Sequence, residues 1–302
     1  MASRLKGILP VLPTPFSDDG SVDEAGMARL VKFALDQGVD GVVFPGFASE
    51  VEKLGADERA NLLGIVVHTV DERVPVVAGA SAGDWREVVE HGKAAVSLGI
   101  RHLMVQPPKS VGIGAPALIE FLGNVLDALP DIEIILQNAP APRGSDLSPE
   151  AIVEILKALP RVAYVKEETL PAGPAISHII SHAPDTLKGV IGGGGARYIL
   201  DEYSRGAIAA MPALEIADEH VALDKAWNAG DHQEARQIYI RTLPLLVLQA
   251  VYRMRLTKYV LARRGIIEHV GVRAPTPDLD GVAIADIDAN LAELGLLSRE
   301  AA

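Results

Sequence analysis

Short, continuous runs of apolar residues recur along the chain, with amphipathic stretches between them. Because their apolar character is continuous rather than alternating, the runs are typical of strands that are buried on both faces of a parallel sheet. They span residues 7–16, 41–46, 74–80, 102–108, 133–138, 162–168, 187–193 and 206–212. The pattern predicts eight strands.

Helix start signals stand in the segments between these runs. Asp23, Asp57 and Asp84 each precede an amphipathic segment, and Ser148 followed by Pro149 opens another. Aspartate and serine side chains accept hydrogen bonds from the free N–H groups of a first helical turn, and proline is favoured at the first helical position. Eight strands that alternate with helices predict a (β/α)8 TIM barrel of the α/β class, since a doubly wound sheet usually has fewer strands.

The pattern changes after the eighth run. Residues 217–265 have helical character throughout, and a last amphipathic stretch covers residues 283–297. We interpret these segments as the eighth barrel helix and a C-terminal helical appendage. The predicted domains are therefore residues 1–228 for the barrel and residues 229–302 for the appendage.

Composition narrows the class of protein. With 49% hydrophobic residues in 302, the chain can bury a large core. The formal net charge is −12 and the basic residues are scattered, which argues against nucleic acid and anionic membranes as partners. There is no cysteine, which excludes disulfides, thiolate metal sites and cysteine nucleophiles. No apolar run approaches the about 18 residues of a membrane helix or resembles a signal peptide, so we expect a cytoplasmic protein.

Lys166 is the strand-end residue with the most reactive chemistry. In a (β/α)8 barrel the carboxyl ends of the strands open into the active site, and Lys166 ends the sixth run, followed by Glu167 and Glu168. An amine held in a partly apolar place loses the solvation of its charged form, its pKa falls, and the neutral amine attacks a carbonyl carbon to give a Schiff base. The alternative is an ion pair between Lys166 and Glu167 or Glu168 at the rim of the barrel.

Several motifs at the strand ends are similar to those of one enzyme family. They are GILPVLPTPF near the N-terminus, Gly46 followed by Ser49-Glu50, NAPAPRG after the fifth run, and YVKEE at the sixth. With them the chain resembles, over nearly its whole length, the dihydrodipicolinate synthase and N-acetylneuraminate lyase family of class I aldolases. The resemblance implies a Schiff base between Lys166 and a small-molecule 2-oxo acid, usually pyruvate, and assembly as a homotetramer. We expect no cofactor and no metal.

Some positions depart from the synthase pattern of that family. Phe47 and Ala48 replace two threonines, Gln137 stands where a tyrosine relays protons, and the arginine of the NAPAPRG motif comes one place late, as Arg143. An amide cannot donate and recover a proton as a phenol can, which disfavours dihydrodipicolinate synthesis. Four pieces of the sequence resemble the 2-keto-3-deoxy-L-arabonate dehydratase branch of the family: Phe47 to Glu50, QNAPAP at 137–142, KEET at 166–169 and LPLL at 243–246.

The resemblance implies a dehydratase that acts on a 2-keto-3-deoxy sugar acid. Two alternatives stay open: a pyruvate-dependent aldolase or synthase that uses the same lysine, and a non-catalytic barrel that binds a 2-oxo acid. A pure binding protein would have little use for a costly desolvated amine.

The predicted site residues follow from these positions. The catalytic residues are Lys166, which forms the imine, Gln137, and Glu50, for which proton transfer and anchoring of its own loop are both open. Glu168 is a second candidate for moving protons. The predicted substrate-binding residues are Phe47, Ala48, Ser49, Asn138, Glu168, Gly193, Gly194 and Met211.

Two further patterns suggest binding sites. The glycine run at 192–195 offers bare backbone N–H groups to a carboxylate or phosphate, but its spacing differs from nucleotide-binding motifs, and we interpret it as a tight turn beside the substrate. His178 and His182 are one helical turn apart, which suits a zinc ion, but no third ligand or intervening glutamate accompanies them. We therefore predict no metal site there.

Overall fold

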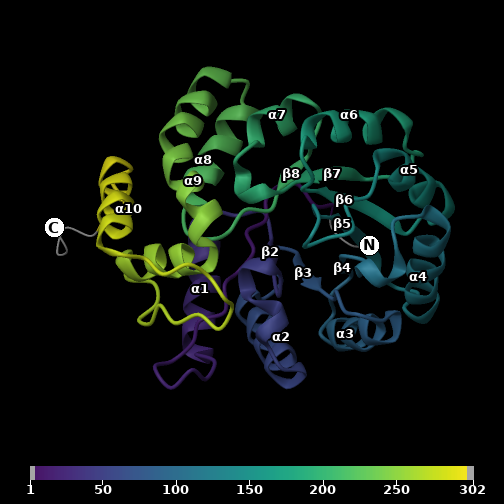
Figure 1. Cartoon of the computed structure of the whole chain (residues 1–302), viewed down its shortest axis with the longest axis horizontal. Helices are drawn as coiled ribbons and strands as arrows, with labels where there is room; N and C mark the ends of the chain where they lie inside the picture. The colour runs from purple at the N-terminus through teal and green to yellow at the C-terminus, as the bar shows by residue number, and fades with distance from the viewer. Residues whose placement is uncertain (1–3, 298–302) are drawn as a thin grey trace. The chain divides into compact units, whose positions relative to one another are not determined.

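The computed structural model describes residues 4–297, and each of the eight predicted runs contains a strand (Figure 1). The strands are β1 Gly7–Ile8, β2 Val42–Val43, β3 Val76–Gly79, β4 His102–Val105, β5 Glu133–Asn138, β6 Val162–Glu167, β7 Gly189–Gly192 and β8 Ala209–Ala210. They form one sheet in the order β1-β8-β7-β6-β5-β4-β3-β2. Beyond β1, the Leu12 N–H donates to the Val43 carbonyl oxygen at 3.0 Å and brings the first strand beside the second. This is the strand order of a (β/α)8 barrel, as predicted.

Helices follow the strands, and three of the four predicted start signals are confirmed. The helices are α1 Glu24–Asp36, α2 Ala56–Val70, α3 Trp85–Ser97, α4 Ala115–Ala128, α5 Pro149–Ala158, α6 Ala172–His182, α7 Ile199–Ser204, α8 Ala217–Asn228, α9 His232–Arg263 and α10 Gly281–Glu293. Asp23, Asp84 and Ser148 cap α1, α3 and α5 with their side chains. The prediction for Asp57 is wrong, because α2 begins one residue earlier and Gly55 is its N-cap. Glu58 accepts a hydrogen bond from the Gly55 N–H there, so a side-chain cap at Asp57 is not needed.

The chain divides into two compact units. The first contains residues 4–6, 75–194 and 198–210, and the second contains residues 7–74, 195–197 and 211–297. In the first unit, helices α3 to α7 pack each against the next along the outside of strands β4 to β7 (Figure 1). In the second unit, α1 packs on α2, and α8 and α10 both pack on α9. The predicted domain boundary between residues 228 and 229 stays a prediction.

The C-terminal helices have a core of their own. Its buried residues are Ile216, Leu245, Leu246, Leu256, Val260, Ile287 and Leu291. The prediction of uninterrupted helix over 217–265 is wrong, because the chain leaves the helix after Asn228 and Gly230 takes a φ of +80°. Inside α9, Pro244 lacks an N–H for the helical ladder and Arg253 departs from helical geometry, with φ 49° and ψ −124°.

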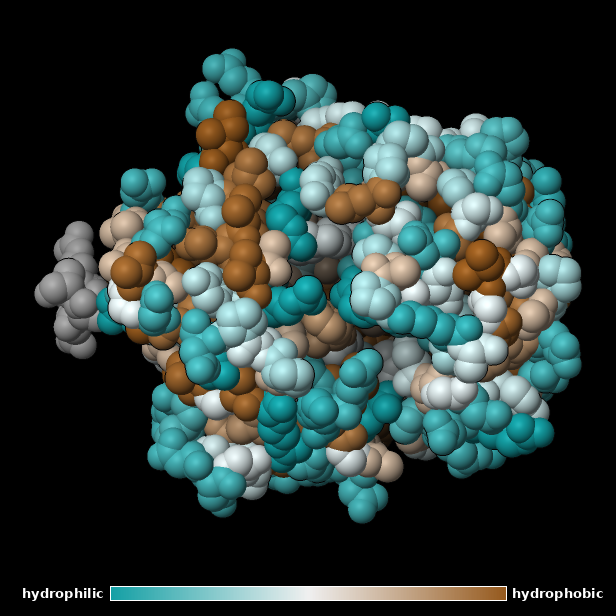
Figure 2. All heavy atoms as spheres, viewed as in Figure 1, coloured by the Kyte–Doolittle hydropathy of each residue, from teal (hydrophilic) through white to brown (hydrophobic). Residues whose placement is uncertain are grey.

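One face of α9 exposes apolar side chains. Ile240, Val247 and Val251 are each more than half exposed, and their spacing of seven and four residues places them on one side of the helix. Figure 2 shows brown side chains gathered over the place that α8 and α9 occupy in Figure 1. Assembly with another chain would cover such a surface, and the homotetramer stays a prediction. None of the described helices has the length and apolar character that crossing a membrane requires.

Candidate active site

Strand β6 places Lys166 at the carboxyl end of a fully buried strand. The four residues before it, Val162 to Val165, are apolar and buried, and Lys166 itself is only 4% exposed. Successive side chains of a strand point to opposite faces of the sheet. Lys166 and Glu168 therefore share one face, and Glu167 lies on the other.

The Glu168 carboxylate is the centre of the contacts around Lys166. Its Oε1 atom lies 3.4 Å from Lys166 Nζ. Its Oε2 atom accepts a hydrogen bond from Gln137 Nε2 at 2.6 Å and lies 3.5 Å from Arg143 Nη2. Gln137 is the register partner of Lys166 in the ladder between β5 and β6, so the two side chains emerge side by side. The four side chains form one polar cluster, which we call the lysine cluster.

Burial and charge set the protonation of the lysine cluster. Burial lowers the pKa of Lys166, and the negative charge of Glu168 acts in the opposite direction. Burial by itself would raise the pKa of Glu168, but the positive charges of Lys166 and Arg143 outweigh it and bring the pKa to about 2. Glu168 is therefore ionised at neutral pH, and Lys166 releases its proton more readily than a lysine in water.

Asn138 and Glu167 occupy the opposite face of the two strands. Asn138 Nδ2 donates to Glu167 Oε2 at 2.9 Å and to the Leu147 carbonyl oxygen at 3.1 Å, and the Leu147 N–H donates to Asn138 Oδ1 at 2.8 Å. Both polar atoms of the Asn138 amide thus have partners within the protein. These contacts support a structural role for Asn138, which anchors the loop at 139–147, in place of the predicted contact with substrate.

The loop at 139–147 brings Arg143 to the lysine cluster. Gln106 Nε2 donates to the Arg143 carbonyl oxygen at 3.0 Å, and Ser145 Oγ donates to the Pro107 carbonyl oxygen at 3.1 Å. Together with Asn138, these bonds tie the loop to the ends of β4 and β5. Arg143 therefore reaches Glu168 from a backbone that is held at several points.

The glycine run after β7 leaves room for two glutamates. A Cβ atom at Gly193 would lie 2.3 Å from Glu168 Cγ, and one at Gly192 would lie 2.0 Å from Glu202 Oε2, so neither position accepts a side chain without a shift of these carboxyls. Gly194 has a φ of +56°, and its N–H points to Glu168 Oε1 at 3.5 Å. The run forms a turn that packs against the lysine cluster, and its predicted position beside the substrate stays a prediction.

The second unit contains the loop that follows β2. Ser49 Oγ donates to the Leu12 carbonyl oxygen and accepts from the Gly46 N–H, and Thr14 Oγ1 donates to the Ser49 carbonyl oxygen at 2.7 Å. Ser49 is fully buried. Its hydroxyl is thus used within the protein, which supports a structural role in place of the predicted substrate contact.

The other predicted binding residues of the second unit differ in exposure. Phe47 and Ala48 are half-buried, and the Arg253 guanidinium lies 5.4 Å from the centre of the Phe47 ring. Met211, just beyond β8, is buried. The structure thus brings Lys166, Gln137, Glu168 and Gly193 together in the first unit, whereas residues 47–50 and Met211 belong to the second.

Glu50 anchors its loop by a buried ion pair. Its Oε1 atom lies 2.6 Å from Lys258 Nζ, and both side chains are fully buried. Its Oε2 atom accepts the backbone N–H groups of Arg273 and Ala274, each at 2.6 Å. Lys258 also donates to the Gly271 carbonyl oxygen at 2.6 Å. Of the two roles that the sequence left open for Glu50, these contacts support anchoring, because both carboxyl oxygens are occupied.

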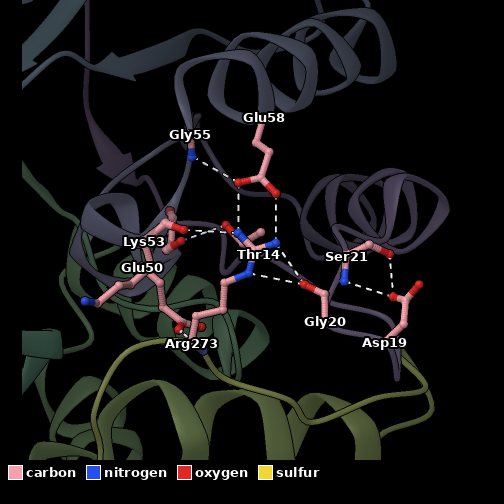
Figure 3. A network of polar contacts seen from close by, with 10 residues as sticks. Thr14, Asp19, Gly20, Ser21, Glu50, Lys53, Gly55, Glu58 and Arg273 are labelled. Carbon is pink, nitrogen blue, oxygen red and sulfur yellow. Dashed lines mark hydrogen bonds and ion pairs between the residues drawn. The ribbon is translucent and has the colours of Figure 1, made fainter.

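The Arg273 side chain extends this network from Glu50 to Glu58 and Gly20 (Figure 3). Its guanidinium binds both oxygens of Glu58 at 2.8 Å and the Gly20 carbonyl oxygen at 2.8 Å. The hydrogen bond from Arg273 lowers the pKa of Glu58. The segment at 271–274 between α9 and α10 is thereby tied to the loops that follow β1 and β2.

The two histidines at zinc spacing lie on α6. Their rings stack with the centroids 4.2 Å apart, and His178 Nε2 lies 3.6 Å from Glu150 Oε1. Within residues 4–297, no group of three or more His, Cys, Asp or Glu side chains is arranged to hold a metal ion.

Comparison with known proteins identifies the family. The sequence model of the Dihydrodipicolinate synthetase family matches residues 4–292. The chain belongs to this family. It is 31% identical over 280 residues to L-2-keto-3-deoxyarabonate dehydratase of Azospirillum brasilense. The aligned region covers 91% of this chain and 90% of the dehydratase. The chain is 28% identical over 297 residues to 4-hydroxy-tetrahydrodipicolinate synthase of Acidobacterium capsulatum, which covers 97% of each.

Solved structures of dihydrodipicolinate synthetase family members share the fold. Dihydrodipicolinate synthase of Rhodopseudomonas palustris has a TM-score of 0.89 at 24% identity, over 96% of this chain and 98% of that one. YagE, a prophage protein of this family from E. coli K12 solved in complex with pyruvate, has a TM-score of 0.87 at 25% identity, over 97% and 100%. Their agreement with the strand order confirms the (β/α)8 barrel with C-terminal helices.

As a member of the dihydrodipicolinate synthetase family, the chain is a class I lyase that acts on a 2-oxo acid through a Schiff base. The lysine cluster offers the parts that such chemistry requires. It combines a desolvated amine, an ionised carboxylate 3.4 Å away, and a guanidinium beside that carboxylate.

Arg143, a member of the lysine cluster, and Glu202 of α7 were not among the predicted site residues. Arg143 was recognised in its motif, but the path of its loop depends on hydrogen bonds that no sequence pattern reveals. Glu202 did leave a signal, because it comes three positions after Ile199 and just before Tyr203, both of them buried. An acidic residue on the buried face of a helix is uncommon and indicates a specific environment.

Proposed function

We propose that the protein is a dehydratase of a 2-keto-3-deoxy sugar acid such as 2-keto-3-deoxy-L-arabonate. The observation that carries this proposal is the hydrogen bond of 2.6 Å from Gln137 to Glu168, whose other oxygen lies 3.4 Å from Lys166. This pair supplies a proton carrier beside the imine without a phenol. The 31% identity to L-2-keto-3-deoxyarabonate dehydratase supports the same class of substrate.

The first step forms the imine. Neutral Lys166 attacks C2 of the 2-oxo acid and passes one of its two amine protons to the carbonyl oxygen. A second proton, taken up from solvent, lets this oxygen leave as water, and the other amine proton remains on the iminium nitrogen. Burial assists this step because it lowers the pKa of Lys166 and increases the share of neutral amine.

The second step removes water from the substrate. The iminium acidifies the C3 protons, Glu168 accepts one of them, and the C–H electrons form the C2=C3 bond of the enamine. The enamine then expels the C4 hydroxyl, the C3=C4 bond forms, and Glu168 returns its proton to the departing oxygen. Glu168 is ionised at neutral pH, so it is in the form that can accept this proton. Hydrolysis of the conjugated iminium frees Lys166.

Gln137 orients the carrier in this mechanism. Because its Nε2 atom donates to Glu168 Oε2, the other oxygen of Glu168 is the one that faces Lys166. An amide keeps its protons throughout, so its role is to orient rather than to transfer. This argues against the alternative of a pyruvate-dependent aldolase or synthase whose phenol relays protons.

The experiment that tests the proposal compares two reactions of the purified protein. One sample receives 2-keto-3-deoxy-L-arabonate alone, and a second receives pyruvate with an aldehyde. We expect a product lighter by one water in the first sample, detected by mass spectrometry and NMR, and no condensation in the second. Release of pyruvate from the sugar acid, or condensation in the second sample, would favour the aldolase or synthase instead. A protein inactive in both would support the binding barrel.

Replacing Glu168 by glutamine is expected to lower kcat for dehydration by about 10²–10⁴-fold, because the amide cannot carry the C3 proton. The same variant should still form a borohydride-reducible adduct with pyruvate, since the amine remains. Glu120→Gln, which changes an exposed glutamate of α4, is the matched control and should keep wild-type kcat. A Glu168→Gln variant with unchanged kcat would rule out Glu168 as the proton carrier.

A further inference from the structure

Glu202 of α7 is a buried acid on the far side of the glycine turn from Glu168. It is only 1% exposed, and its Oε2 atom lies against the Cα of Gly192 with no hydrogen-bond partner among the described residues. A Cβ atom at Gly193 would lie 2.3 Å from Glu168 Cγ. The backbone of Gly192 and Gly193 thus lies between the two glutamates, with one carboxyl on each side.

The charged groups around Glu202 are mainly negative. The charges of Glu168 and Glu167, at the end of β6, and of Asp201, on its own helix, disfavour its ionised form. Lys166 is the cation that interacts with it, and that amine is already paired with Glu168. An ionised Glu202 would lose its hydration and be repelled by the neighbouring carboxylates. Burying an un-ionised carboxyl group without a partner costs much less free energy.

We propose that Glu202 is a positioning residue that works as a neutral acid: it holds the Gly192–Gly193 backbone against Glu168, and its ionisation at alkaline pH slows imine formation at Lys166. The inference rests on the proposed Schiff-base role of Lys166. It assigns the glycine run a purpose beyond a tight turn, because only glycine lets both carboxyls approach the backbone this closely.

The ionisation of Glu202 affects imine formation by changing the pKa of Lys166. Burial raises the pKa of Glu202 to about 8, and the neighbouring carboxylates add to this effect. Above that pH the new carboxylate raises the pKa of Lys166, so a larger share of the amine is protonated and unable to attack. The rate of imine formation in wild type should therefore rise less steeply above about pH 8 than it would without the ionisation of Glu202.

The test compares wild type with Glu202→Gln, which keeps the size and an acceptor oxygen but cannot ionise. Each protein is mixed with pyruvate between about pH 6.5 and 9.5, quenched with borohydride at increasing times, and analysed by intact mass. We expect similar rates near pH 6.5 and a rate in the variant that exceeds that of wild type once the pH passes about 8, where Glu202 of the wild type loses its proton. Glu120→Gln should follow wild type at every pH.

A structural role alone would give a different result. If Glu202 only fills space, Glu202→Gln should change the rate by the same factor at every pH, and this outcome would overturn the proposal. A variant that is slower than wild type only above pH 8 would do the same, because it would mean that the charged form assists the reaction.

The pH dependence of the free energy of unfolding reports whether Glu202 is protonated, and it can be measured without substrate. A carboxyl group that stays protonated up to about pH 8 in the folded protein loses its proton near pH 4.5 when unfolded. The folded state then binds more protons between these values, so the free energy of unfolding falls as pH rises through this range. Urea unfolding of Glu202→Gln should show a shallower fall than wild type, and identical slopes would contradict the neutral acid.

Two measurements, pyruvate trapping and urea unfolding, distinguish a failure of this inference from a failure of the proposed function. If neither protein traps pyruvate at any pH, the Schiff-base role of Lys166 fails, and the claimed effect on imine formation fails with it. The difference in unfolding would still decide whether Glu202 is neutral. If both proteins trap pyruvate but neither dehydrates the sugar acid, the proposed substrate fails while the pH comparison stands on its own.

Discussion

Replacing Lys166 by alanine is expected to abolish both turnover and covalent trapping. Without the amine no imine forms, and kcat should fall by roughly four orders of magnitude or more, as is usual when a covalent nucleophile is removed. In the wild type, borohydride reduction in the presence of 2-keto-3-deoxy-L-arabonate should leave an adduct on the intact protein that is lighter by one water than the reduced imine of the undehydrated substrate. A pyruvate-sized adduct would point to the aldolase instead.

Controls for this result distinguish a lost nucleophile from a lost fold. Lys166→Arg keeps the positive charge beside Glu168 but cannot form an imine, so it should fold and remain untrapped. Lys157→Ala removes an exposed lysine of α5 and should trap like wild type. If Lys166→Ala and Lys166→Arg still carried the adduct, another amine would have to be the nucleophile, and the role of the lysine cluster would be that of an ion pair alone.

Replacing Lys258 by methionine is expected to lower the free energy of unfolding by about 3–5 kcal/mol, because Glu50 would keep its charge in a fully buried place without its cation. Urea unfolding monitored by circular dichroism measures the change. Lys32→Met, an exposed lysine of α1, is the matched control and should stay within about 0.5 kcal/mol of wild type.

A second substitution tests whether the unpaired charge is the cause. Adding Glu50→Gln to Lys258→Met removes that charge while the side-chain oxygen still accepts from the backbone N–H groups at 273 and 274. The double variant should therefore be more stable than Lys258→Met alone. A loss below about 1 kcal/mol in Lys258→Met, or a double variant that is less stable than the single one, would count against the anchoring role of Glu50.

The fold was largely predictable because it depends on local patterns. A strand buried on both faces must be apolar along its whole length, so β5 and β6 appear in the sequence as unbroken runs. The caps at Asp23, Asp84 and Ser148 also act within one helical turn. The wrong predictions, at the start of α2 and over residues 217–265, arose where the local sequence is compatible with two structures. At α2 a glutamate of the first turn bonds back to the Gly55 N–H, and the stretch after the eighth run is divided at Gly230.

The site was predictable in part. Lys166 was noticed because an amine at the end of a buried strand costs free energy. Gln137 was noticed because it replaces a phenol that is typical of the family that the chain resembles. The hydrogen-bond partners of Asn138, Ser49 and Glu50 were not predictable, because they depend on the direction in which each side chain points. Asn138 turns to Leu147, Ser49 to Leu12, and Glu50 to Lys258, which is 208 residues away in the chain.

The sequence by itself determined the α/β barrel and the position of a lysine at the end of its sixth strand, and it indicated the kind of chemistry that we propose for this lysine. These depend on periodicity, on strand ends and on residue type, which are properties of short segments. Only the tertiary structure decided which groups surround that lysine. The charge of Glu168 depends on Lys166 and Arg143, and the environment of Glu202 depends on a glycine turn from another element. Electrostatic energies depend on distance and burial, and both arise only when distant segments meet in the folded chain.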